Sequence, residues 1–143
     1  MTLQLLRNFS RFLELRPASQ EELQGEKFKL RFGPTFPAEP STKFAVLFEA
    51  VVVTEGGMIL TTEYYSVFET SDTITDEFKE SHFLRSNAPA IGFPFLRACF
   101  AQVCLMAGHK HVVIPSVNFV ERSKDPQHFI TAESPLVLET SEA

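Results

Sequence analysis

The chain is poor in several residue types, and each scarcity argues against a class of protein. Among its 143 residues there is no tryptophan, and there are only two cysteines and four histidines. No run of about 18 apolar residues is present to span a bilayer, and the N-terminal residues contain no uninterrupted signal-peptide core. We therefore expect a cytoplasmic protein with no integral membrane segment.

Positive charge is scarce as well. The 13 Lys and Arg residues are outnumbered by 18 Asp and Glu residues, and the formal net charge is -5 at pH 7. A nucleic-acid-binding protein needs a basic stripe to neutralise phosphates, and the sequence shows none. Hydrophobic residues make up 44% and charged residues 22%, which is typical of a globular chain with one core. We predict a single domain over residues 1–143 and no nucleic acid among its partners.

The cysteines and histidines do not form a persuasive catalytic or metal-binding pattern. Cys99 and Cys104 are five residues apart in a predicted helix, where their side chains diverge too far to form a disulfide. Both lie in the most apolar stretch of the chain, which favours core packing over a nucleophilic role. His109 and His111 could share a strand face as metal ligands, but solvated residues after a helix end are the favoured interpretation. We expect no enzymatic activity, no cofactor and no metal site.

Phenylalanine, by contrast, is abundant, with 15 residues. Phe28 and Phe32 alternate with basic residues and predict a half-buried strand that ends at Gly33-Pro34. Most of the rings are expected in a phenylalanine-rich core. The remainder are expected to be partly exposed in a groove, because exposed apolar patches on globular proteins mark binding sites.

A β-hairpin is the best local prediction. Residues 43–54 and 58–70 are rich in β-branched and aromatic residues and flank Glu55-Gly56-Gly57, which has the length and composition of a three-residue hairpin turn. Pairing Thr54 with Met58 sets the register. The residues then expected opposite one another are Phe44 and Phe68, Val46 and Ser66, Phe48 and Tyr64, Val52 and Leu60, Lys43 and Glu69, and Glu49 and Glu63. The last pair is a like-charge rung, which indicates an acidic surface on the face away from the core.

Residues 93–108 predict an apolar helix. Phe93-Pro94 indicates its start, since proline at the first helical position loses no hydrogen bond, and Gly108 indicates its end. Between these limits only Arg97 and Gln102 are polar, and Arg97 is either a snorkelling surface residue or the partner of a carboxylate across an interface. A helix that is apolar nearly all round needs a second covering surface besides its own sheet. We therefore predict an oligomer joined through this helix, with the interface candidates Phe95, Cys99, Phe100, Val103, Cys104, Leu105 and Met106.

The segments that flank these elements carry weaker signals. Residues 3–15 fit an imperfect strand alternation and also a helical stripe, so periodicity leaves both open. Residues 72–80 are acidic and predict a short capped helix. Pro126 and Pro135 interrupt any long helix near the end of the chain, so about residues 120–143 are expected to form an irregular or mobile tail.

One stretch of the sequence resembles a known family. Pro89-Ala90-Ile91-Gly92-Phe93-Pro94-Phe95-Leu96-Arg97, followed by an apolar helix, a glycine and then Val117-Asn118-Phe119, is similar to the signature of the SecB family of protein-export chaperones. Residues 2–10 resemble the first strand of that family, which favours a strand over residues 2–17. The likeness covers residues 2–17 and 43–119.

The resemblance implies an α+β fold. In that fold one long apolar helix packs on a four-stranded antiparallel sheet, and the C-terminal helix would be short or absent here because of Pro126. It also implies a homo-oligomer in which dimers pair into a tetramer around the helices. The implied function is that of a holdase, which binds unfolded or precursor polypeptides for Sec-dependent protein export.

The same resemblance suggests where partners bind. The family contacts the SecA motor through acidic positions on the sheet; Glu63 matches one of them, and Glu49 lies opposite it in the predicted register. Phe12 and Arg16 fall where the family has further acidic residues, so a divergent SecB-like chaperone of a toxin-antitoxin system fits as well. Apart from the resemblance, the abundance of aromatic residues suggests client-binding residues that are partly exposed in a groove: Phe48, Tyr64, Phe68, Phe83, Leu84 and Phe93. Two other interpretations stay open: an adaptor for a single partner, and a domain that encloses an apolar small molecule.

Overall fold

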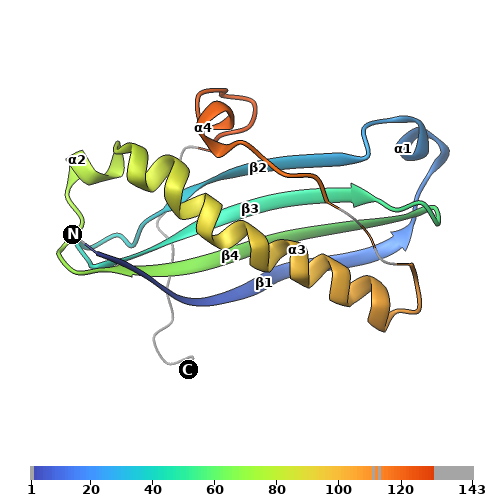
Figure 1. The fold of residues 1–143 in the computed structure, drawn as a ribbon, viewed down its shortest axis with the longest axis horizontal. Coiled ribbons are helices and arrows are strands. Elements are labelled where there is room, and N and C mark those ends of the chain that lie inside the picture. The colour runs from blue at the N-terminus through green and yellow to red at the C-terminus, as the bar shows by residue number, and fades with distance from the viewer. Residues whose placement is uncertain (1, 111, 113, 131–143) are drawn as a thin grey trace.

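The protein is an α+β domain in which one long helix lies across one face of a four-stranded sheet (Figure 1). The computed structural model describes residues 2–110, 112 and 114–130. The strands are β1 (Leu3–Pro17), β2 (Phe28–Thr35), β3 (Lys43–Val53) and β4 (Met58–Thr70), all antiparallel to their neighbours in the order β1-β4-β3-β2. The helices are α1 (Gln20–Gln24), α2 (Asp76–Lys79), α3 (Ala88–Met106) and α4 (Phe119–Arg122), and a π-helical turn, η1 (Phe83–Asn87), leads into α3.

The hairpin forms in the predicted register. The Thr54 N–H donates to the Met58 carbonyl at 2.8 Å, and every predicted pair from Lys43–Glu69 to Val52–Leu60 is present. Phe44 and Phe68 stack with ring centroids 5.3 Å apart. The expected capped helix also forms as α2, whose first turn is closed by Thr75.

The N-terminal segment is a strand, as the family resemblance implied. β1 pairs with β4 along its length, but the register shifts between Leu5 and Arg7 and again between Ser10 and Phe12. Each shift inserts a residue and moves the following side chains to the other face. These two bulges explain why the alternation in the sequence was imperfect.

β2 extends to Thr35, beyond the Gly33-Pro34 end that the sequence predicted. Proline interrupts a strand when its missing N–H is needed by a neighbouring strand. Here β2 is at the edge of the sheet, and the Phe32 N–H and C=O point away from β3. Pro34, two residues later, shares this orientation, so no bond to β3 is lost.

The core lies between the sheet and α3, and phenylalanine dominates it as expected. One face of each strand points toward the helix, and the largest side chains there are fully buried: Phe32, Phe44, Phe48, Leu60 and Phe68. Leu84 of η1 and Leu96 and Phe100 of α3, also fully buried, pack against them. Burial of one such side chain stabilises the fold by about 1.5–3 kcal/mol. This face therefore fixes α3 on the sheet.

The start of α3 differs from the prediction. The helix begins at Ala88 rather than at Phe93, so Pro89 takes the early position in which a missing N–H costs nothing, and Pro94 lies inside the helix. Pro94 and Ala90 are both exposed, so the Ala90 carbonyl that Pro94 cannot pair with is accessible to water. The predicted end is correct: Gly108 has a φ of 85°, and the His109 N–H bonds to the Cys104 carbonyl at 2.8 Å.

The segment after α3 differs in part from the expected irregular tail. α4 is short, as expected, and Asn118 caps it by accepting bonds from Val120 N and Glu121 N. Residues 128–130 then pair with the outer edge of β2, through bonds from Phe32 N to the His128 carbonyl (2.9 Å) and from Ile130 N to the Phe32 carbonyl (2.7 Å). Residues 131–143, the rest of the expected tail, lie outside the described part of the chain.

One helical segment, Phe83–Met106, is long and apolar enough to cross a membrane by length and composition alone. It is not the uninterrupted apolar run that the sequence was expected to lack, because Arg85, Ser86, Asn87, Arg97 and Gln102 lie within it. In the structure one side of this helix packs on the sheet (Figure 1), and the core helices of globular proteins can have the same length and apolar composition.

Candidate binding surfaces

The outward side of α3 carries an apolar stripe that one polar residue, Gln102, interrupts. We name Ile91, Phe95, Leu105 and Met106 the outer stripe; their exposed fractions are 42%, 45%, 60% and 87%. The spacing of four residues from Ile91 to Phe95, three to Ala98 and seven from there to Leu105 places these side chains on one side of the helix, with the exposed Gln102 between Ala98 and Leu105. The opposite side of α3 is fully buried on the sheet. The helix is thus apolar on both sides, and the described part of the chain covers only one of them.

The seven predicted interface residues divide between these two sides of α3. Phe95, Leu105 and Met106 are exposed, and Cys99 and Val103 are partly buried. The prediction is wrong for Phe100 and Cys104, which are 0% exposed because α3 turns them toward its own sheet. Burial raises the pKa of the Cys104 thiol, which agrees with a packing role.

Arg97 is exposed, and its guanidinium lies 5.9 Å from the centre of the Phe93 ring. Within the described residues it forms no ion pair. Its environment is that of a surface arginine resting on an aromatic ring.

The predicted client-binding residues are mostly part of the core. The expectation of partial exposure is wrong for five of the six, whose exposed fractions run from 0% to 6%: Phe48, Tyr64, Phe68, Leu84 and Phe93. Phe48, Tyr64 and Phe68 lie on the sheet face that η1 and α3 cover, and Leu84 of η1 and Phe93 of α3 pack against that face. Burial raises the pKa of Tyr64 to about 12. Phe83 alone is exposed, at 37%, and its ring lies 6.1 Å from that of Phe78.

An apolar edge that the sequence did not predict lies along β1. Leu6, Phe12 and Leu13 are 40%, 46% and 44% exposed on this 15-residue edge strand. α3 passes over β1, where Ser10 Oγ and Cys99 Sγ are 3.8 Å apart, and its C-terminal end extends beyond the strand (Figure 1). An exposed edge strand offers unpaired backbone groups to an extended peptide. The sequence does not predict this apolar edge because the two bulges interrupt the simple alternation of buried and exposed residues.

The opposite edge of the sheet is protected. Residues 128–130 form hydrogen bonds with the N–H and C=O of Phe32, and Arg122 Nη1 donates to the Leu30 carbonyl at 3.4 Å. Pro34 has no N–H that could pair with another strand. Strand addition by another polypeptide is therefore easier at β1 than at β2.

The two predicted acidic partner residues lie side by side on the sheet face away from α3. This face, which we call the far face, carries Ala45, Leu47 and Glu49 of β3, and Glu49 is opposite Glu63 as predicted. Arg31 of β2 lies opposite Glu49 and forms an ion pair with it at 2.8 Å. The rung is thus less acidic than the sequence suggested, because the neighbouring strand supplies a cation.

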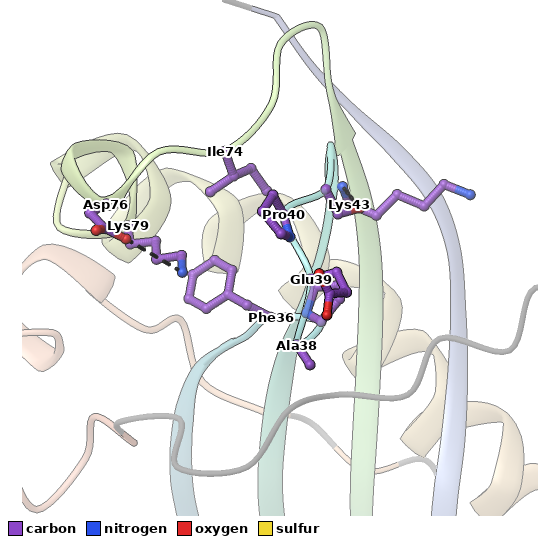
Figure 2. Close-up of a pocket in the computed structure, with 10 residues that line it drawn as sticks. Phe36, Ala38, Glu39, Pro40, Lys43, Ile74, Asp76 and Lys79 are labelled. Atoms are coloured by element: carbon purple, nitrogen blue, oxygen red, sulfur yellow. Dashed lines mark hydrogen bonds and ion pairs between the residues drawn. The ribbon is translucent and has the colours of Figure 1, made fainter.

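A pocket lies between the proline-rich β2–β3 loop and α2 (Figure 2). Its volume is about 140 Å³, well below the several hundred Å³ typical of small-molecule sites. The Lys79 ammonium lies 4.8 Å above the Phe36 ring and 3.7 Å from the Asp76 carboxylate. Among the described residues no three His, Cys, Asp or Glu side chains are grouped to hold a metal ion.

Solved structures with the same architecture identify the fold. One is the Mycobacterium tuberculosis Rv1957 SecB-like chaperone, solved in complex with a ChAD peptide from the Rv1956 HigA1 antitoxin. The match covers 80% of this chain and 90% of that chain, with a TM-score of 0.56 and 13% sequence identity. A Streptococcus agalactiae protein of unknown function matches 82% of this chain and 98% of its own length, with a TM-score of 0.62 and 12% identity. No protein-family model and no curated protein matches the sequence. The chain therefore has a SecB-like fold.

Proposed function

We propose that this protein is a SecB-like chaperone that holds non-native polypeptides without catalysing a reaction. The observation that carries the proposal is the outer stripe: a SecB-like domain presents an apolar helix side that its own described residues leave uncovered. The peptide bound to the M. tuberculosis SecB-like chaperone supports a polypeptide as the ligand class.

In this proposal the surfaces have separate roles. The outer stripe joins subunits into a homo-oligomer, with a dimer of dimers as the expected assembly. Phe83 and the β1 edge bind clients, because unfolded chains expose apolar side chains and unpaired backbone groups that folded proteins hide. Several weak sites on one oligomer then act together on a long client, so affinity follows the folding state of the client rather than its sequence.

Aggregation assays with several unrelated proteins test this function. Three chemically denatured proteins are each diluted into buffer that contains the purified protein, and aggregation is followed by light scattering. A general holdase suppresses the scattering of all three at near-stoichiometric ratios. Protection of none of them contradicts the proposal.

A toxin-antitoxin context is the second candidate, and the antitoxin peptide in the M. tuberculosis complex favours it. In that case the chain protects one antitoxin much better than unrelated denatured proteins. The same scattering assay separates the two, because a dedicated chaperone leaves the unrelated proteins to aggregate.

Delivery to the Sec translocase requires contact with SecA, and Glu63 is the acidic residue best placed for it. Exposed ionic contacts are worth about 1 kcal/mol or less, so Glu63→Lys is expected to weaken SecA binding about fivefold or more by reversing the charge. Titration of labelled protein with SecA measures this, and Glu55→Lys in the hairpin turn is the control with the same charge change. Unaltered SecA affinity, or no SecA binding by the wild type, contradicts an export role while leaving client holding intact.

A further inference from the structure

The far face of the sheet carries a second apolar cluster that α3 does not cover. Ala45, Val67 and Tyr65 are 0%, 4% and 5% exposed, and Phe9 and Leu47 pack against them. The Phe9 and Tyr65 rings stack at 5.1 Å. α3 lies on the other side of the sheet (Figure 1). The long helix therefore does not cover this face.

The described chain ends at the border of this face. Phe32 faces the core, so the alternation of β2 directs the next position, Gly33, toward the far face. A Cβ on Gly33 would lie 2.0 Å from the Ile130 carbonyl oxygen and 2.9 Å from the Ile130 Cβ. The Ile130 main chain thus lies directly on Gly33, in a notch that any larger residue would fill. The chain passes from the edge of β2 onto the far face at this point.

The strand register places an apolar row directly ahead of Ile130. Gly33 is opposite Leu47, Leu47 is opposite Tyr65, and Tyr65 is opposite Phe9. These residues form one line across the sheet. Ala45 and Val67 form the next row on the same face. A polypeptide that continues across the sheet from Gly33 therefore contacts apolar side chains as far as β1.

We propose that the C-terminal segment, residues 131–143, docks on the far face of its own subunit, with Leu136-Val137-Leu138 on the row formed by Leu47, Tyr65 and Phe9. This is the only run of three apolar residues after Ile130. Eight residues separate Leu138 from Ile130, an extended reach of about 26 Å. Three strand spacings amount to about 14 Å, so the segment is long enough.

Charge supports the same direction of docking. Glu139 follows the apolar run, and the β1 end of the row is flanked by two arginines. The Arg7 guanidinium lies 4.7 Å from the centre of the Phe9 ring, and Arg11 Nη1 donates to the Tyr65 hydroxyl at 3.2 Å. A carboxylate beyond Leu138 meets these cations. The inference does not depend on the proposed function, because it concerns only how the chain covers its own sheet.

Tyrosine fluorescence tests the docking without a client. The chain has no tryptophan and two tyrosines, so Tyr64→Phe leaves Tyr65 as the single reporter on the far face. In this background we expect truncation after Ile130 to raise acrylamide quenching of Tyr65 at least about twofold, because an apolar patch becomes exposed. Replacing Leu136, Val137 and Leu138 by Ser is expected to do the same, whereas Glu142→Gln is the control with no change. Unchanged quenching on truncation overturns the inference.

A cross-link distinguishes docking in cis from the other occupants and does not rely on truncated variants. Leu47→Cys with Leu138→Cys is expected to form an intramolecular disulfide on mild oxidation, identified by peptide mass, and Glu55→Cys with Leu138→Cys is expected to form none. Cross-links that join only two separate copies would show that a second subunit covers the far face and would overturn the inference. The same holds if no 47–138 link forms while Tyr65 quenching falls on addition of an unfolded client.

Discussion

Phe95→Glu combined with Leu105→Glu is expected to convert the assembled protein into folded monomers. Both side chains are about half exposed or more on the outer stripe and do not take part in the core of their own subunit. In the assembly each carboxylate would be buried without a partner, at a cost of several kcal/mol. The association constant should therefore fall by more than about a hundredfold.

Light scattering on a sizing column, with far-UV circular dichroism, measures this effect. The matched control is Val120→Glu, which replaces another exposed apolar side chain, 38% exposed on α4, by the same carboxylate. The control should keep both the wild-type mass and the wild-type spectrum. A double variant that stays fully assembled would show that the outer stripe is not the interface.

Gly92→Ala is expected to destabilise the monomer, although alanine favours helix formation over glycine by about 1 kcal/mol. A Cβ at position 92 would lie 2.4 Å from Ser66 Oγ, 2.8 Å from Ser66 Cβ and 3.3 Å from Phe48 Cε2. α3 approaches β4 closely at this point, and Ser66 is held by donating to Asn8 Oδ1 at 2.6 Å. Such overpacking lowers the free energy of unfolding by about 1–3 kcal/mol.

Urea denaturation followed by circular dichroism measures the change. Gly56→Ala is the control, because the nearest atom to a Cβ there is Thr54 Oγ1 at an ordinary 3.8 Å. Adding Ser66→Gly to Gly92→Ala removes both close contacts and should restore part of the lost stability. An increase in stability for Gly92→Ala alone would mean that α3 does not pack this closely on the sheet.

The sequence predicted those elements whose formation depends on residues close together in the chain, such as turns and helix ends. The hairpin register followed from one turn, Glu55-Gly56-Gly57, and was correct at every predicted pair. The start of α3 differs from the prediction because a proline typical of a first helical turn, Pro94, is exposed and tolerated inside the helix. α1 was missed although Ser19 and Glu22 form a capping box that the sequence displays.

The exposure of individual residues could not be predicted in the same way. An all-apolar helix does not indicate which side faces its own sheet, so Cys104 and Leu105 were placed together although one is buried and the other exposed. The pairing of residues 128–130 with β2 joins segments about a hundred residues apart, and no local pattern encodes it. The ion pair between Arg31 and Glu49 likewise depends on the pairing of β2 with β3, which no local pattern specifies.

The mass of the wild-type protein in dilute buffer, measured by sedimentation equilibrium with and without an unfolded client, is the most direct test of a chaperone built around an uncovered apolar helix. We expect a multiple of 16.1 kDa for the free protein and a heavier complex once the client is added. A single 16.1 kDa species that takes up no client would contradict this expectation.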